Sequence, residues 1–226
     1  MVQAIALIDA NNFYAACEQS INPSLSGRPI VVLSNNDGCI IARSAEARAL
    51  GIAMGQPYFK VRHELERLDI IVLSSNYALY GDMSRRLMEL LKVHSEHLEI
   101  YSIDEAFMQL SRPSYYHLYH WARQLRSLVN QNLGLPIAIG IGSNKSQAKL
   151  ANQIAKAVTI HAGVFDLMTT TDQDAWLATI AIENIWGIGR KLSRRGRMQG
   201  ITTALQLRDT PSNEIKSIFG IIGIRL

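Results

Sequence analysis

Residues 101–107 read Tyr-Ser-Ile-Asp-Glu-Ala-Phe and place two adjacent carboxylates, Asp104 and Glu105, inside an apolar run from Leu98 to Leu110. Ionised carboxylates are rare in such runs unless they are paired or bind a metal. The run predicts two short strands with the two carboxylates at the turn between them. Taken alone, the pair favours an ordinary solvated hairpin turn, because short motifs match by chance.

The flanking segments predict a mixed α+β fold. Apolar runs at residues 4–8 and 137–141 predict two more strands. Amphipathic helices are expected at residues 13–19, capped by Asn11 or Asn12, and from Ser143, as the cap, to about Ala157. Two further helices have apolar faces, Tyr80, Met83, Leu87 and Leu90 in the first and Leu118, Trp121, Leu125 and Leu128 in the second.

Residues 23–75 are expected to be an insertion with its own strands. Asn35-Asn36-Asp37-Gly38 predicts a tight turn between a strand at 30–33 and its partner at 39–42. Ser44 is predicted to cap a short helix that stops at Gly51.

Without this insertion, the elements follow the β-α-β-β-α-β order of a ferredoxin-like sheet. In that topology the third strand lies between the first and the second. The end of the first strand therefore lies at the same end of the sheet as the turn between the second and third. Asp9 ends the first strand, so we expect it to meet Asp104 and Glu105.

Three such carboxylates repel one another and indicate a bound cation. Oxygen ligands suit Mg²⁺, and two ions about 4 Å apart would serve phosphoryl transfer. The alternative is that Asp9 only caps the helix that follows it. Basic residues that could neutralise a polyphosphate include Arg43, Arg48, Lys145, Lys149 and Lys156.

Positive charge is concentrated near the C-terminus. Residues 1–175 hold 15 Lys and Arg against 16 Asp and Glu, whereas residues 176–226 hold 8 against 3. Within this segment, residues 185–192 read Ile-Trp-Gly-Ile-Gly-Arg-Lys-Leu, the pattern of a helix-hairpin-helix that binds DNA phosphates. The predicted DNA-binding residues are Gly187, Gly189, Arg190, Lys191, Arg194 and Arg195. An interhelical turn with basic flanks is the alternative.

The composition excludes several classes of protein. The 226 residues are 48% hydrophobic and 19% charged, which is typical of a globular chain. Two cysteines, Cys17 and Cys39, provide no disulfide framework and indicate a reducing compartment. We expect no signal peptide and no membrane segment.

Together these residues resemble the Y-family translesion DNA polymerases, and most closely the UmuC-type branch of bacterial SOS mutagenesis proteins. The matching segments are residues 9–15, 34–39, 75–77, 101–107, 148–152 and 186–189. The resemblance implies a palm (residues 1–22 and 76–168), small fingers (23–75) and a helical thumb with the helix-hairpin-helix (169–226). The family's little-finger domain and clamp-binding tail do not occur before Leu226, so we expect a catalytic core without them.

The resemblance also implies roles for individual residues. Asp9, Asp104 and Glu105 match the catalytic metal ligands, and the main-chain carbonyl of Ala10 matches another ligand of the two Mg²⁺ ions, for which Mn²⁺ can substitute. Phe13 and Tyr14 match the wall beside the sugar, with Tyr14 as the steric gate against a ribose 2′-OH. The triphosphate-binding positions are matched by Arg48 and Lys156.

The implied function is template-directed transfer of a nucleotide from a dNTP to a primer 3′-OH on damaged template DNA. The implied partners are primer–template DNA, a UmuD-like protein, a RecA-like recombinase and a sliding clamp, in the bacterial cytoplasm at the nucleoid. A nucleotide cyclase and a truncated, inactive DNA- or partner-binding regulatory protein are the rival hypotheses. Two departures from the family are Ala45, in place of a phosphate-contacting Tyr, and Gly196, which is expected to loosen its helix.

Overall fold

The computed structural model describes residues 2–112, 115–158 and 162–225. The chain forms two compact units. One, here called the carboxylate unit, comprises Ile8–Met108 and His120–Ala138. The other, here called the basic unit, comprises Met1–Leu7, Gln109–Tyr119 and Ile139–Leu226. The palm, fingers and thumb boundaries expected from the sequence divide the chain differently and stay predictions.

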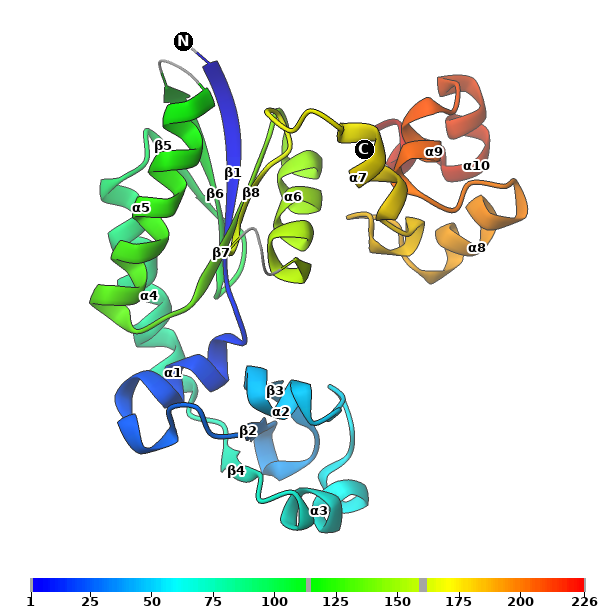
Figure 1. Cartoon of the computed structure of the whole chain (residues 1–226). Coiled ribbons are helices and arrows are strands. Elements are labelled where there is room, and N and C mark those ends of the chain that lie inside the picture. The colour runs from blue at the N-terminus through cyan, green and yellow to red at the C-terminus, as the bar shows by residue number, and fades with distance from the viewer. Residues whose placement is uncertain (1, 113–114, 159–161, 226) are drawn as a thin grey trace. The chain divides into compact units, whose positions relative to one another are not determined.

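The main sheet has five strands in the order β5-β6-β1-β7-β8 (Figure 1). The strands are β1 (Val2–Ala10), β5 (His97–Ile100), β6 (Glu105–Arg112), β7 (Ile137–Gly142) and β8 (Val164–Asp166). The first four follow the predicted ferredoxin-like order, with β6 between β1 and β5, so the predicted fold class is confirmed. The fifth strand was not predicted, because three residues are too few to show a period; β8 pairs in parallel with β7.

Helices α1 (Phe13–Ile21) and α4 (Tyr77–Val93) belong to the carboxylate unit, and α5 (Tyr115–Leu133) follows β6. The buried face of α4 is Tyr80, Met83, Leu87, Met88 and Leu91, so Leu91 takes the buried position predicted for Leu90. The prediction that an Asn side chain caps α1 is wrong. Asn12 does occupy the N-cap position, but its backbone is left-handed (φ 52°) and its side chain makes no capping hydrogen bond.

Residues 30–74 form a small lobe with their own sheet, in the order β3-β2-β4. Its elements are β2 (Ile30–Leu33), β3 (Ile40–Arg43), α2 (Ala45–Ala49), α3 (Tyr58–Arg67) and β4 (Ile71–Ser74). The predicted tight turn is present, because Asn36 and Asp37 both have positive φ. The Ser44 hydroxyl accepts a hydrogen bond from the Ala47 amide, as predicted for a helix cap.

The described helices of the basic unit are α6 (Lys145–Ala157), α7 (Gln173–Thr179), α8 (Arg190–Met198), α9 (Ala204–Asp209) and α10 (Ser212–Arg225). Asn144, not the predicted Ser143, caps α6 by accepting from the Gln147 amide at 2.9 Å. The side chain of Ser143 instead donates to Gln147 Oε1 at 2.7 Å. Among the helices that the structure describes, no helix has the length and apolar character needed to cross a membrane.

Glycine at two positions lets the elements of the basic unit approach closely. A Cβ on Gly140 of β7 would lie 2.1 Å from the amide nitrogen of Asn152 in α6. A Cβ on Gly196 of α8 would lie 2.6 Å from Cδ1 of Ile182 and 2.9 Å from Cζ of Phe219. Gly196 therefore allows α8 to pack closely against these two side chains. The expectation that it loosens its helix stays a prediction.

Candidate functional site

The predicted carboxylates lie on the hairpin between β5 and β6. The amides of Tyr101 and Ser102 both donate to the carbonyl of Glu105, at 3.0 and 3.1 Å, and close the turn. The amide of Ala10, at the end of β1, donates to the carbonyl of Asp104 at 3.0 Å. The backbone next to Asp9 therefore lies beside the turn that carries Asp104 and Glu105, nearly a hundred residues later in the chain.

Ser102 holds this turn through its side chain, a role that was not predicted. Its hydroxyl donates to Asp104 Oδ1 at 2.7 Å and accepts from the amides of Asp104 and Glu105 at 3.3 and 3.0 Å. Ser side chains often accept hydrogen bonds from backbone amides two or so residues later, so Ser102 itself was the local signal for this turn. The carboxylate of Asp104 is thus oriented by its own turn.

The three carboxylate side chains differ in burial. Asp9 is buried, at 8% exposure, whereas Asp104 and Glu105 are half-buried. Among residues 2–112, 115–158 and 162–225, no group of three or more His, Cys, Asp or Glu side chains is arranged to hold a metal ion. The available ligands are carboxylate and carbonyl oxygens, which are the donors that Mg²⁺ prefers. The residues therefore fit Mg²⁺ by donor type, on a backbone that brings the segments together.

Aromatic side chains of α1 and α4 pack against one another. The Tyr14 ring stacks on Tyr80, with ring centroids 4.3 Å apart and planes 14° apart, and meets the Tyr77 ring edge-on at 6.0 Å. Burial, with smaller effects of Tyr77 and Asp104, raises the pKa of the Tyr14 hydroxyl. The effect of Asp104 means that its carboxylate lies within electrostatic reach of Tyr14. Phe13 is buried at 4% exposure.

The two predicted triphosphate ligands lie on different units. Arg48 is exposed in the last turn of α2, within the small lobe of the carboxylate unit. Lys156 is exposed in the last turn of α6, in the basic unit. The carboxylates and Tyr14 thus share one unit with Arg48 but not with Lys156.

The predicted helix-hairpin-helix corresponds to η4 (Ile182–Asn184), a turn at residues 185–189 and helix α8. Gly187 has φ +87°, a conformation that favours glycine. Gly189 is extended, and a Cβ there would meet nothing within 4 Å. Folding does not require glycine at position 189, so its small size would matter only to a molecule that approaches the turn from outside.

The basic residues of α8 are presented to solvent. The four predicted for DNA binding are all exposed: Arg190, Lys191, Arg194 and Arg195. Arg195 also donates to the carbonyl of Ser217 at 3.1 Å. Arg197 is paired with Glu183, and its hydrogen bond lowers the pKa of that carboxyl.

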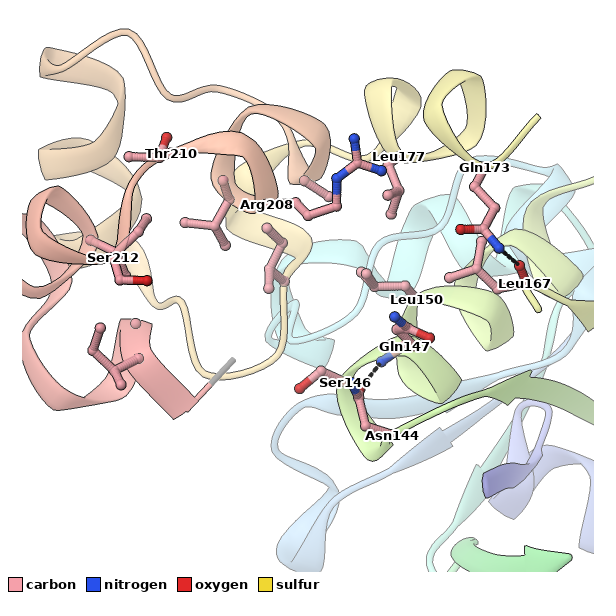
Figure 2. Close-up of a pocket in the computed structure, with 16 residues that line it drawn as sticks. Asn144, Ser146, Gln147, Leu150, Leu167, Gln173, Leu177, Arg208, Thr210 and Ser212 are labelled. Atoms are coloured by element: carbon pink, nitrogen blue, oxygen red, sulfur yellow. Dashed lines mark hydrogen bonds between the residues drawn. The ribbon is translucent and has the colours of Figure 1, made fainter. Parts of the chain in front are cut away.

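A cavity of about 380 Å³ lies in the basic unit, apart from the predicted site residues (Figure 2). Its lining includes Leu150 and Gln147 of α6 and Leu177 and Arg208 of α7 and α9. Gln173 at its edge donates to the carbonyl of Leu167 at 2.8 Å. None of the residues predicted to bind metal, nucleotide or DNA is among the described residues that line it.

Comparisons with known proteins agree with the resemblance seen in the sequence. The profile of the impB/mucB/samB family matches residues 8–153. Protein UmuC of Salmonella typhimurium is 45% identical over 219 residues, which cover 96% of this chain and 52% of UmuC. DNA polymerase IV of Bacillus velezensis is 31% identical and is matched over 97% of this chain and 52% of its own length.

A solved structure has the same fold. The insertion ternary complex of Dbh DNA polymerase superposes with a TM-score of 0.84 at 25% identity, over 98% of this chain and 65% of that chain. The chain spans about half the length of the curated relatives it matches.

Proposed function

Because this chain belongs to the impB/mucB/samB family, we propose that it is the catalytic core of a DNA-directed DNA polymerase of the translesion type. The primer 3′-OH attacks the α-phosphate of a dNTP, the new P–O bond forms, and pyrophosphate leaves. Polymerase names among the relatives support this proposal.

One observation carries the proposal. The Ala10 amide binds the Asp104 carbonyl, so the strand that ends in Asp9-Ala10 lies beside the Asp104-Glu105 turn. Two segments with hard oxygen donors are thereby joined in one place, which is what a two-metal phosphoryl transfer requires.

We assign roles as follows. Asp9, Asp104, Glu105 and the carbonyl of Ala10 would hold two Mg²⁺ ions, for which Mn²⁺ could substitute; bound there, the ions supply acidification of the primer hydroxyl and neutralise triphosphate charge. Ser102 keeps the Asp104 carboxylate oriented through its 2.7 Å hydrogen bond. Tyr14 stands against the sugar and excludes a ribose 2′-OH, with Phe13 beside it.

The other proposed roles concern the triphosphate, the DNA duplex and protein partners. Arg48 and Lys156 bind the triphosphate. The turn at Gly187 and Gly189, with the exposed cations of α8, binds phosphates of the primer–template duplex, and its affinity falls with salt. A UmuD-like protein is a partner suggested by the UmuC relative; the recombinase, the sliding clamp and a place at the bacterial nucleoid rest on the family resemblance.

Primer extension tests the proposal. The chain should add dNTPs to a 5′-labelled primer on a plain template when Mg²⁺ or Mn²⁺ is present, and EDTA should stop the reaction. Adding the same dNTPs without template should give no product. Synthesis that continues in the presence of EDTA would overturn the assignment. A lack of synthesis with Mg²⁺ and with Mn²⁺ would overturn it as well.

The rival functions have their own outcomes in the same assay. A nucleotide cyclase would release pyrophosphate from a single nucleotide with no primer present. An inactive DNA- or partner-binding protein would bind the labelled duplex and leave it unextended. The exposed basic face of α8 favours a duplex ligand over cyclase activity.

A further inference from the structure

Tyr80 lies in the carboxylate unit and has no predicted role in binding a ligand. It belongs to the first turns of α4, where its amide donates to the carbonyl of Asn76 at 3.0 Å. Its side chain is fully buried, at 0% exposure. The ring nevertheless does more than fill the core, because one of its faces is stacked on Tyr14 at 4.3 Å.

The hydroxyl of Tyr80 reaches a second residue of α1. It donates to Glu18 Oε1 at 2.8 Å. Glu18 follows Tyr14 by four residues, so the two side chains lie on the same face of α1, one turn apart. Tyr80 therefore contacts α1 at two points, with its ring against Tyr14 and its hydroxyl against Glu18.

These two contacts restrict different motions. The hydrogen bond fixes the direction of the Tyr80 ring, because a buried hydroxyl that loses its acceptor is costly. The stack then fixes the plane of Tyr14, since aromatic pairs gain stability from a defined offset or edge geometry. Tyr77 meets Tyr14 edge-on and limits its tilt in a second direction.

We propose that Tyr80 and Glu18 are positioning residues that set sugar discrimination through Tyr14, an inference that rests on the polymerase activity proposed above. Neither residue needs to touch the nucleotide. Steric discrimination between groups that differ by one small substituent is worth about 10- to 200-fold, and it depends on where the wall stands. If the Tyr14 ring can tilt away from the sugar, the site accommodates the extra 2′-hydroxyl of an rNTP.

The test compares single-nucleotide insertion of matched rNTP and dNTP by the full chain and its variants. Tyr14→Ala is the reference for complete loss of the wall. Tyr80→Leu keeps an apolar side chain but removes the stack, and it should raise relative rNTP use about tenfold. Tyr80→Phe and Glu18→Ala each keep a ring at position 80 but remove the hydrogen bond, and they should raise it about threefold.

Two matched variants separate positioning from general damage. Glu18→Gln retains an oxygen acceptor for the Tyr80 hydroxyl and should keep wild-type discrimination. Tyr77→Phe deletes a tyrosine hydroxyl one turn before Tyr80 on α4 but keeps the ring, and it should also keep wild-type discrimination. If Tyr80→Leu fails to fold, as a fully buried position permits, Tyr80→Phe and Glu18→Ala decide the matter.

The outcomes keep the two proposals apart. If the wild type inserts dNTPs and Tyr14→Ala relaxes the sugar preference, but neither Tyr80→Phe nor Glu18→Ala changes it, the positioning role is wrong and the polymerase stands. If dNTP and rNTP insertion fall together in these variants, the pair is merely structural. A wild type that inserts no dNTP overturns the polymerase and the inference with it.

Discussion

The carboxylate turn and helix α8 present their functional groups in opposite ways. Around Asp104 and Glu105, backbone amides and the Ser102 hydroxyl fix the turn, and β6 continues into the buried residues Ala106 to Met108. Only Ser193 and Gly196 of α8 are buried, and its cations extend into solvent. The Asp104 carboxylate is oriented by hydrogen bonds within its turn, whereas most side chains of α8 are exposed.

The difference matches the chemistry proposed for each region. Phosphoryl transfer is sensitive to misplacement of about 1 Å, so its ligands belong on paired strands. Binding to duplex phosphates depends mainly on charge and counterion release, so mobile side chains suffice. Four changes would break or sharpen this comparison.

Asp104→Asn should have the largest effect. Asparagine still offers an oxygen to the Ser102 hydroxyl, so the turn keeps its shape while the ligand charge is lost. We expect incorporation to fall roughly a thousandfold or more, since metal ions supply several kcal/mol of transition-state stabilisation. Single-turnover insertion measures the rate, and thermal unfolding should show an unchanged or slightly raised midpoint, because one repulsive charge is gone.

Glu64→Gln removes one charge from the exposed face of α3 and serves as the control for Asp104→Asn. It should leave insertion unchanged. A near-normal rate in Asp104→Asn would show that the turn is only structural.

Gly140→Ala tests how firmly the sheet framework is fixed. The new Cβ would meet main-chain atoms, Asn152 N at 2.1 Å and Ala148 O at 2.4 Å, which cannot rotate away. We expect a loss of about 3 kcal/mol in the free energy of unfolding, at the upper end of overpacking costs. Urea unfolding measures this loss. The control is Gly81→Ala in helix α4, where a Cβ would meet nothing within 4 Å; this change should be neutral or stabilising.

Reversing Arg194 and Arg195 to Glu should weaken DNA binding roughly 10- to 100-fold and leave single-turnover chemistry on saturating DNA intact. If both residues bind phosphates, the log–log salt slope should shrink by about 1.8. Fluorescence anisotropy against salt on a primer–template measures both quantities. The control reverses two exposed cations of other helices, Arg67 and Lys92; equal weakening by both pairs would argue for nonspecific charge rather than a site on α8.

Gly196→Ala should have the smallest effect, a loss of about 1 kcal/mol. Its clashes are with side-chain atoms of Ile182 and Phe219, which can move, and alanine favours the helix. Chemical denaturation followed by Trp fluorescence would report it. Gly189→Ala meets no atom within 4 Å and should unfold like wild type. A larger loss for Gly196→Ala than for Gly140→Ala would show that the packing of α8 is less tolerant than the packing of β7 against α6.

The sequence predicted the sheet because strong local signals agreed with one another. Four strands, the tight turn at Asn36 and Asp37 and the Ser44 cap all have short-range signatures. β8 was missed because pairing with β7, rather than its own pattern, makes its three residues a strand. The cap at Asn144 was misplaced by one residue because Ser143 and Asn144 are both good caps, and only the path of the chain decides between them.

The candidate site was predictable where topology determines it and not where side chains do. Strand order alone places Asp9 near Asp104. The roles of Ser102 and Tyr80 depend on hydrogen bonds and ring stacking that no periodicity reveals. Tyr80 was correctly predicted to be buried, but the sequence does not say that its buried ring would face Tyr14.

The small lobe begins and ends on two neighbouring strands, which run parallel. The Ile71 amide donates to the Pro29 carbonyl at 2.9 Å, and Ile30 and Ile71 are partners in the parallel strands β2 and β4. The lobe also has its own core, which includes Val31, Ile40 and Leu65. A segment whose first and last strands pair with each other and that has its own core can be exchanged as a unit. Recombination between relatives could therefore replace residues 30–74 as a block.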